Sequence, residues 1–72
     1  MQTIVYNRNS NKVILYKGLT RNGKVLAVFD NIVNHIVKNG VHIFYSKNEP
    51  ALMASVSLTN LIFENNERKT TN

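Results

Sequence analysis

Two histidines, His35 and His42, are the residues of this chain whose chemistry most needs weighing, since the sequence contains no cysteine. If their segments pair as a hairpin, the two imidazoles are diagonal neighbours on one face, about 7 to 8 Å apart. Two imidazoles could bind zinc together with a third ligand, but no cysteine and no nearby carboxylate supplies one inside the hairpin. We therefore interpret both histidines as partly buried, hydrogen-bonded side chains. We predict neither a metal site nor a cofactor.

The other polar residues do not predict catalysis. A nucleophilic serine or threonine needs a positioned base, and the serines here fall in a turn or on expected strands. Paired carboxylates are not predicted either, because the acidic residues are only Asp30, Glu49, Glu64 and Glu67. The three glycines are isolated from one another and form no phosphate-binding loop. The sequence therefore predicts a protein that is not an enzyme.

Basic residues suggest one kind of partner. The chain carries nine Lys and Arg against four acidic residues, a net charge of +5. In a meander, alternate turns meet at opposite ends of the sheet, and one end collects Arg21, Lys24 and Lys38 with no acidic residue beside them. Such an end could contact phosphates, while Tyr16 or Tyr45 stacks on bases. A basic β module that binds RNA or single-stranded DNA is therefore the alternative function.

An apolar surface suggests a second kind of partner, and we favour it. Paired as a hairpin, residues 33–38 and 41–46 present one face that is too apolar to remain in water on a stable monomer. The residues expected on this face are Ile36, Val41, Ile43, Tyr45 and Met53. If the opposite face, with Phe44, forms the core, this one becomes a protein interface.

Short apolar runs separated by turn residues predict an all-β fold that positions these residues. The expected strands cover residues 3–6, 12–17, 24–29, 33–38, 41–46, 52–58 and 61–63. Asn22-Gly23 and Asn39-Gly40 each predict a type I′ hairpin turn, which needs positive φ at both central positions. Residues 31–38 could instead form one short helix in an α+β fold. A strand is favoured there because every apolar residue is β-branched and the helix would be very short.

The elements add up to one small domain, a mostly antiparallel meander of six or seven short strands covering residues 1–64. Residues 65–72 form a polar tail that we expect to be disordered. Open edges and strands that are apolar on both faces favour closure into a barrel or a two-layer sandwich. A chain of this size buries only about 60% of its unfolded surface. Self-association is then the leading means of stabilisation, because disulfides are absent.

The same features predict a class of function. The Asn- and Lys-rich, turn-dense composition is similar in style to small proteins of phages and mobile elements. No apolar run approaches the roughly 20 residues of a membrane span, and the first residues lead straight into a strand rather than a signal sequence. We predict a cytoplasmic, non-enzymatic binding or regulatory protein that acts through protein–protein contacts and self-associates as a homo-oligomer.

Overall fold

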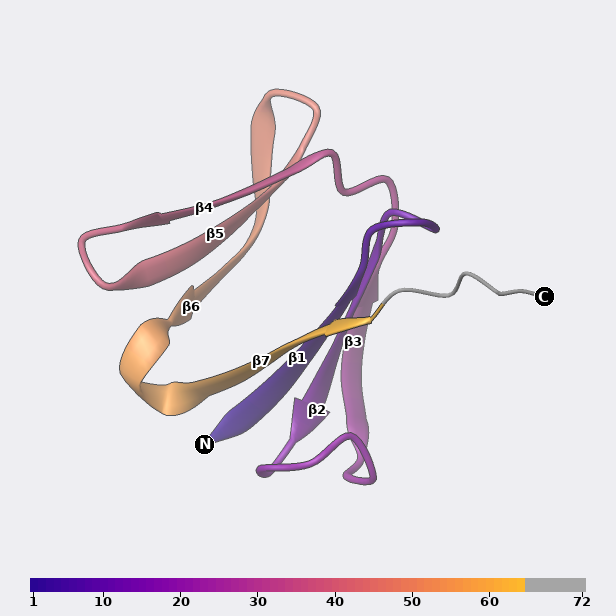
Figure 1. Ribbon diagram of the computed structural model, residues 1–72, viewed down its shortest axis with the longest axis vertical. Coiled ribbons are helices and arrows are strands. Elements are labelled where there is room, and N and C mark those ends of the chain that lie inside the picture. Colours follow the sequence, from indigo (N-terminus) through magenta and orange to yellow (C-terminus); the bar gives the residue numbers. More distant parts are fainter. Residues whose placement is uncertain (65–72) are drawn as a thin grey trace, which may run out of the picture.

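The computed structural model describes residues 1–64 as an all-β domain, as predicted (Figure 1). Its elements are β1 (Gln2–Asn7), β2 (Lys12–Lys17), β3 (Val25–Phe29), β4 (Asn34–Lys38), β5 (Val41–Ser46), β6 (Glu49–Ser55), the 3₁₀ helix η1 (Val56–Leu58) and β7 (Thr59–Glu64). The alternative helix over residues 31–38 is wrong, because β4 is a strand there. The expected tail, residues 65–72, lies outside the described residues.

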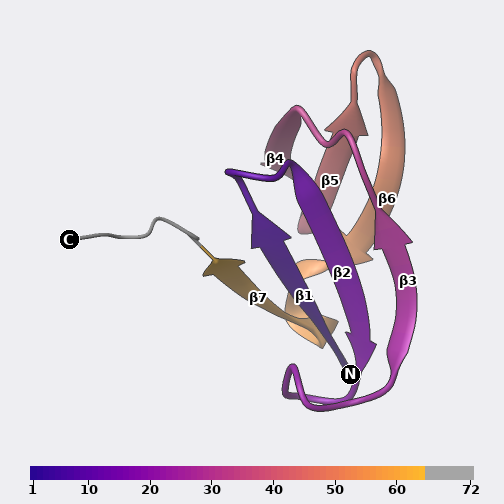
Figure 2. The same ribbon diagram turned by 90° about the vertical axis from the view of Figure 1, so that its right-hand side faces the viewer.

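The strands form two sheets that do not close into a barrel. One is four-stranded, with the order β3-β2-β1-β7, and the other is three-stranded, with the order β4-β5-β6. Figures 1 and 2 show the two sheets set at an angle, joined by the β3–β4 connection and by η1. Because η1 carries the chain from β6 back to the first sheet, β7 pairs with β1 in parallel. The succession of antiparallel hairpins therefore ends at β6.

The core lies between the sheets and includes one residue of a connection. The fully or almost fully buried members of the cluster are Ile4, Tyr6, Val13, Ile32, Phe44 and Ala54. Phe44 and Ala54 come from the three-stranded sheet, whereas Ile32 follows β3 and has no exposed surface. Complete burial of a side chain as large as that of Ile32 contributes about 1.5 to 3 kcal/mol. Because the cluster combines residues from both sheets, the inner faces of the sheets cover each other.

The two Asn-Gly pairs form different turns. Asn39 has φ 52° and Gly40 has φ 74°, so the β4–β5 turn has the positive φ angles of a type I′ turn. Its register, with Lys38 opposite Val41 and Ile36 opposite Ile43, is the predicted one. At Asn22-Gly23 the prediction is wrong: neither residue has positive φ, and residues 18–24 form a longer loop, the β2–β3 loop.

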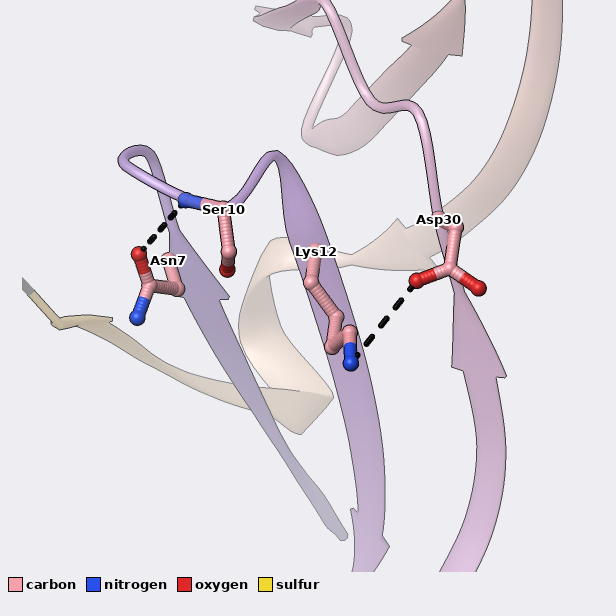
Figure 3. Close-up of polar contacts among 4 residues, drawn as sticks. All are labelled: Asn7, Ser10, Lys12 and Asp30. Atoms are coloured by element: carbon pink, nitrogen blue, oxygen red, sulfur yellow. Dashed lines mark hydrogen bonds and ion pairs between the residues drawn. The ribbon is translucent and has the colours of Figure 1, made fainter.

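The β1–β2 turn and strand β6 each show one further local feature. In the β1–β2 turn, Asn7 Oδ1 accepts a hydrogen bond from the Ser10 backbone N–H at 3.1 Å (Figure 3). The expected strand over residues 52–58 is wrong at both ends, because β6 begins at Glu49 and ends at Ser55. Pro50 therefore lies within β6 instead of in a loop. Proline is tolerated there because β6 is an edge strand.

The β2–β3 loop is bonded to side chains of β1 and β7 on the outer side of the four-stranded sheet. Thr3 donates its hydroxyl hydrogen to the Gly18 carbonyl at 2.8 Å, and Asn60 Nδ2 donates to the Leu19 carbonyl at 3.2 Å. Arg21 pairs with Glu64 at 2.8 Å. By register, Thr3, Asn60 and Glu64 share the side of the sheet that carries Val5, which is only 2% exposed. The loop thus lies against β1 and β7 on this side, whereas Val28 of β3 on the same side stays 50% exposed.

Candidate functional site

The five residues predicted to form a protein interface lie together on the side of the three-stranded sheet that faces away from the core. Ile36, Ile43 and Met53 make one row across β4, β5 and β6, because Ile43 is paired with both of the others. Val41 and Tyr45 precede and follow Ile43 by two residues on β5, so they point to the same side. We call this set the outer face, defined by Ile36, Val41, Ile43, Tyr45 and Met53.

The exposed fraction of each side chain on the outer face depends on whether its strand is central or at the edge of the sheet. Ile43 is only 8% exposed because neighbours on both adjacent strands surround it, whereas Met53, on the edge strand β6, is 59% exposed. Ile36, Val41 and Tyr45 are half-buried. Lys38 is the one charged residue that strand register places on this side, at the end of β4. The surface is therefore an apolar row with a positive charge at one end.

The three basic residues expected at one end of the sheet are not brought together. Arg21 and Lys24 belong to the β2–β3 loop, whereas Lys38 adjoins the β4–β5 turn, and Figure 1 shows these two turns far apart. The expectation that no acidic residue lies there is wrong, because β7 returns alongside β1 and brings Glu64 to Arg21. The hydrogen bond and the charge of Glu64 raise the pKa of Arg21.

The two histidines form a hydrogen-bonded pair inside an aromatic cluster. His35 Nε2 and His42 Nδ1 are 3.0 Å apart, and the tautomer decides which ring donates. The His35 ring stacks on Phe44 with 4.4 Å between centroids and meets the edge of Tyr6 at 6.2 Å. Burial lowers the pKa of His35, and the neighbouring His42 and the charge of Arg8 lower it further. The neutral imidazole is therefore favoured.

This cluster is a packing unit, and part of it was missed by sequence reasoning. Phe63 of β7 lies 6.0 Å from the Tyr6 ring, and the Arg8 guanidinium carbon sits 4.9 Å from the centre of the Phe63 ring. The parallel β1–β7 pairing creates these contacts, and no local pattern predicts it. Within residues 1–64, no group of three or more His, Cys, Asp or Glu side chains could hold a metal ion.

Comparison with known proteins adds no function. No protein-family model, no curated protein and no solved structure matches this chain. Among the described residues, no helix is long and apolar enough to cross a membrane. The fold and the outer face thus define a small two-sheet β protein, and its function must be inferred from its own surfaces.

Proposed function

We propose that this chain is a non-enzymatic binding protein that works as a homo-oligomer and contacts a partner protein through its outer face. The observation that carries the proposal is the cross-strand row Ile36–Ile43–Met53. A contiguous apolar surface on a small domain is typical of a protein interface. The β2–β3 loop is hydrogen-bonded to β1 and β7 on the outer side of the other sheet, but no described loop makes side-chain hydrogen bonds of this kind to the outer face.

The charge on the outer face defines the chemistry of the partner. Lys38 contributes a positive charge at the end of the apolar row, and register places no acidic residue of β4, β5 or β6 on that side. The complementary surface is an apolar patch bordered by a carboxylate. Binding without catalysis suits a regulatory protein in the style of the small phage proteins. A cytoplasmic site of action belongs to the same proposal, because small secreted domains are usually stapled by disulfides.

The test uses two exposed side chains that differ in which side of the sheet they occupy. Met53 is 59% exposed on the outer face, and Val37 is 57% exposed on the opposite side of β4. Tagged full-length chain, Met53→Asp and Val37→Asp are used for affinity capture from the native host. We expect Met53→Asp to lose a protein that the other two retain. Ile43→Asp is less suitable, because a charge at an 8% exposed position would also destabilise the fold.

Two controls decide between the protein partner and a nucleic acid. Circular dichroism must show the same β spectrum for all three chains, and every capture is repeated after nuclease treatment. A partner that Met53→Asp still binds, or one that disappears with nuclease, contradicts the proposal. The alternative, RNA or single-stranded DNA, requires salt-sensitive retention on a polyanion column that weakens in the Arg21→Ala, Lys24→Ala and Lys38→Ala variants. Lys38 ends β4 in the other sheet, away from the β2–β3 loop that carries Arg21 and Lys24, and this gives the alternative less support.

A further inference from the structure

The chain contains the same reactive dipeptide twice, as Asn22-Gly23 and as Asn39-Gly40. Asparagine is a thermolabile residue, because the backbone nitrogen that follows it can attack its side-chain amide. Glycine as the next residue hinders this attack least, since it has no Cβ. Both dipeptides also follow a basic residue, Arg21 or Lys38. A large difference in their reactivity in the folded chain would therefore be caused by the structure.

The β2–β3 loop holds Asn22-Gly23 in place. The Gly23 N–H, which is the attacking group, donates to the Thr20 carbonyl at 3.3 Å. The Asn22 N–H donates to Thr20 Oγ1 at 3.2 Å. The backbone of Lys17 lies so close to Gly23 that a Cβ there would overlap it. The attacking nitrogen is therefore engaged, and the peptide group around it has little room to rotate.

The β4–β5 turn leaves Asn39-Gly40 open to the same reaction. Both residues are exposed, and Figure 1 shows this turn at the end of the β4–β5 hairpin. The Gly40 carbonyl accepts a hydrogen bond from the Val56 N–H at 2.9 Å, but within residues 1–64 the Gly40 N–H donates no turn or loop bond. A Cβ at Gly40 would meet nothing within 4 Å. Local opening of a two-residue turn is then enough to bring the Gly40 nitrogen to the side chain of Asn39.

We propose that Asn39 is a site of spontaneous deamidation in the folded protein, whereas Asn22 is protected. The Gly40 nitrogen loses its proton to solvent and attacks Asn39 Cγ. The Cγ–Nδ2 bond breaks, and the amide nitrogen takes up a proton and leaves as ammonia. Water then opens the cyclic imide at one of its two carbonyls, which gives aspartate or, when the chain continues through the side-chain carbonyl, isoaspartate. The reaction consumes water and releases ammonia.

The products would alter the outer face in two ways, and this consequence rests on the proposed function. A carboxylate at position 39 directly follows Lys38, so it reduces the positive charge at the end of the apolar row and repels a partner bordered by a carboxylate. Isoaspartate also adds a methylene to the backbone of the turn. Turn geometry fixes the register that places Ile36 opposite Ile43. Both products therefore weaken binding through the outer face.

Peptide mapping of the folded, full-length chain tests the modification without any partner. Samples are incubated in mildly alkaline buffer, and mass spectrometry measures conversion at Asn39, at Asn22 and at Asn60, a control that leucine follows. We expect Asn39 to react about tenfold faster than Asn22, because freeing the Gly23 N–H first breaks a hydrogen bond. In guanidinium chloride the two rates should converge. The proposal is overturned if Asn22 reacts as fast as Asn39 in the folded chain, or if Asn39 reacts as slowly as Asn60.

Matched variants separate the modification from its effect on binding. Asn39→Gln should abolish the fast reaction, because attack on the longer side chain must close a larger ring, whereas Asn22→Gln should leave the reaction unchanged. Asn39→Asp reproduces one product, and in affinity capture at low salt it should retain less of the outer-face partner than Asn39→Gln does. Equal capture refutes the effect on binding, while the peptide map alone decides the modification. The proposed function and the deamidation therefore fail separately.

Discussion

Replacing Gly23 with alanine should destabilise the domain more than the same change at Gly40, although both glycines follow an asparagine. An alanine Cβ at position 23 would overlap the carbonyl oxygen of Lys17 and lie 3.1 Å from its carbonyl carbon. Both atoms belong to the backbone, so the β2–β3 loop must shift. At Gly40, where φ is 74°, a Cβ meets nothing within 4 Å. There the penalty is conformational only, and asparagine tolerates that conformation.

The expected magnitudes follow from the contacts. Displacing residue 23 would break the bond from Lys17 N–H to the Lys24 carbonyl, at 2.8 Å, and that from the residue 23 N–H to the Thr20 carbonyl, at 3.3 Å. Each contributes about 1 kcal/mol, so Gly23→Ala should lower the free energy of unfolding by about 2 kcal/mol. Gly40→Ala should lower it by about 1 kcal/mol.

Urea unfolding at one fixed protein concentration, followed by circular dichroism, measures these differences. Asparagine separates the two causes: Gly40→Asn should recover most of the stability that Gly40→Ala loses, whereas Gly23→Asn should be as damaging as Gly23→Ala. If asparagine rescues position 23 as well, that glycine adopts positive φ. The close approach to Lys17 would then be refuted.

Two further predictions concern the core and the histidine pair. Ile32→Ala should lower the free energy of unfolding by about 2 to 5 kcal/mol, because it leaves a cavity in the core. Val33→Ala, at a neighbouring side chain that is 57% exposed, should change it little. Equal effects of the two variants in urea unfolding would contradict the burial of Ile32. Because the pKa of His35 is lowered in the folded chain, the unfolded chain binds a proton first as the pH falls. The contribution of His35 to stability is therefore complete above the unfolded pKa of about 6.5 and is lost as the pH falls from there through the lower folded pKa. The urea midpoint should therefore fall between pH 7 and pH 5 less steeply in His35→Phe than in the unmodified chain, and identical slopes would refute the assignment.

Local patterns predicted the β4–β5 hairpin of this fold well. The register of β4 against β5 followed from Asn39-Gly40 and from the alternation of side chains, and the same reasoning placed Ile36, Ile43 and Met53 on one side. These relations join neighbours in sequence, where the turn fixes the pairing. The identity of the outer-face residues was therefore readable, although its use as an interface stays a proposal.

Relations between distant segments could not be predicted in the same way. The parallel pairing of β7 with β1 depends on η1, which reverses the route of the chain after Ser55. That pairing brings Glu64 to Arg21 and Phe63 to Arg8. Asn22-Gly23 also failed as a local signal, because the β2–β3 loop is held by the side chains of Thr3 and Asn60. The tertiary contacts therefore determined the conformation of this loop and overrode the preference of Asn-Gly for a type I′ turn.

Several strands of this fold carry apolar side chains on both faces, and these side chains are accommodated in three ways. The inner faces of the two sheets cover each other, with Ile32 between them. The β2–β3 loop is hydrogen-bonded to Thr3 on the outer side of the larger sheet, where Val5 is only 2% exposed. Apolar side chains stay exposed outside these two arrangements, among them Met53 on the outer face and Val28 on β3. A short chain can therefore cover part of its own double-sided strands, and the apolar side chains that stay exposed remain for partners.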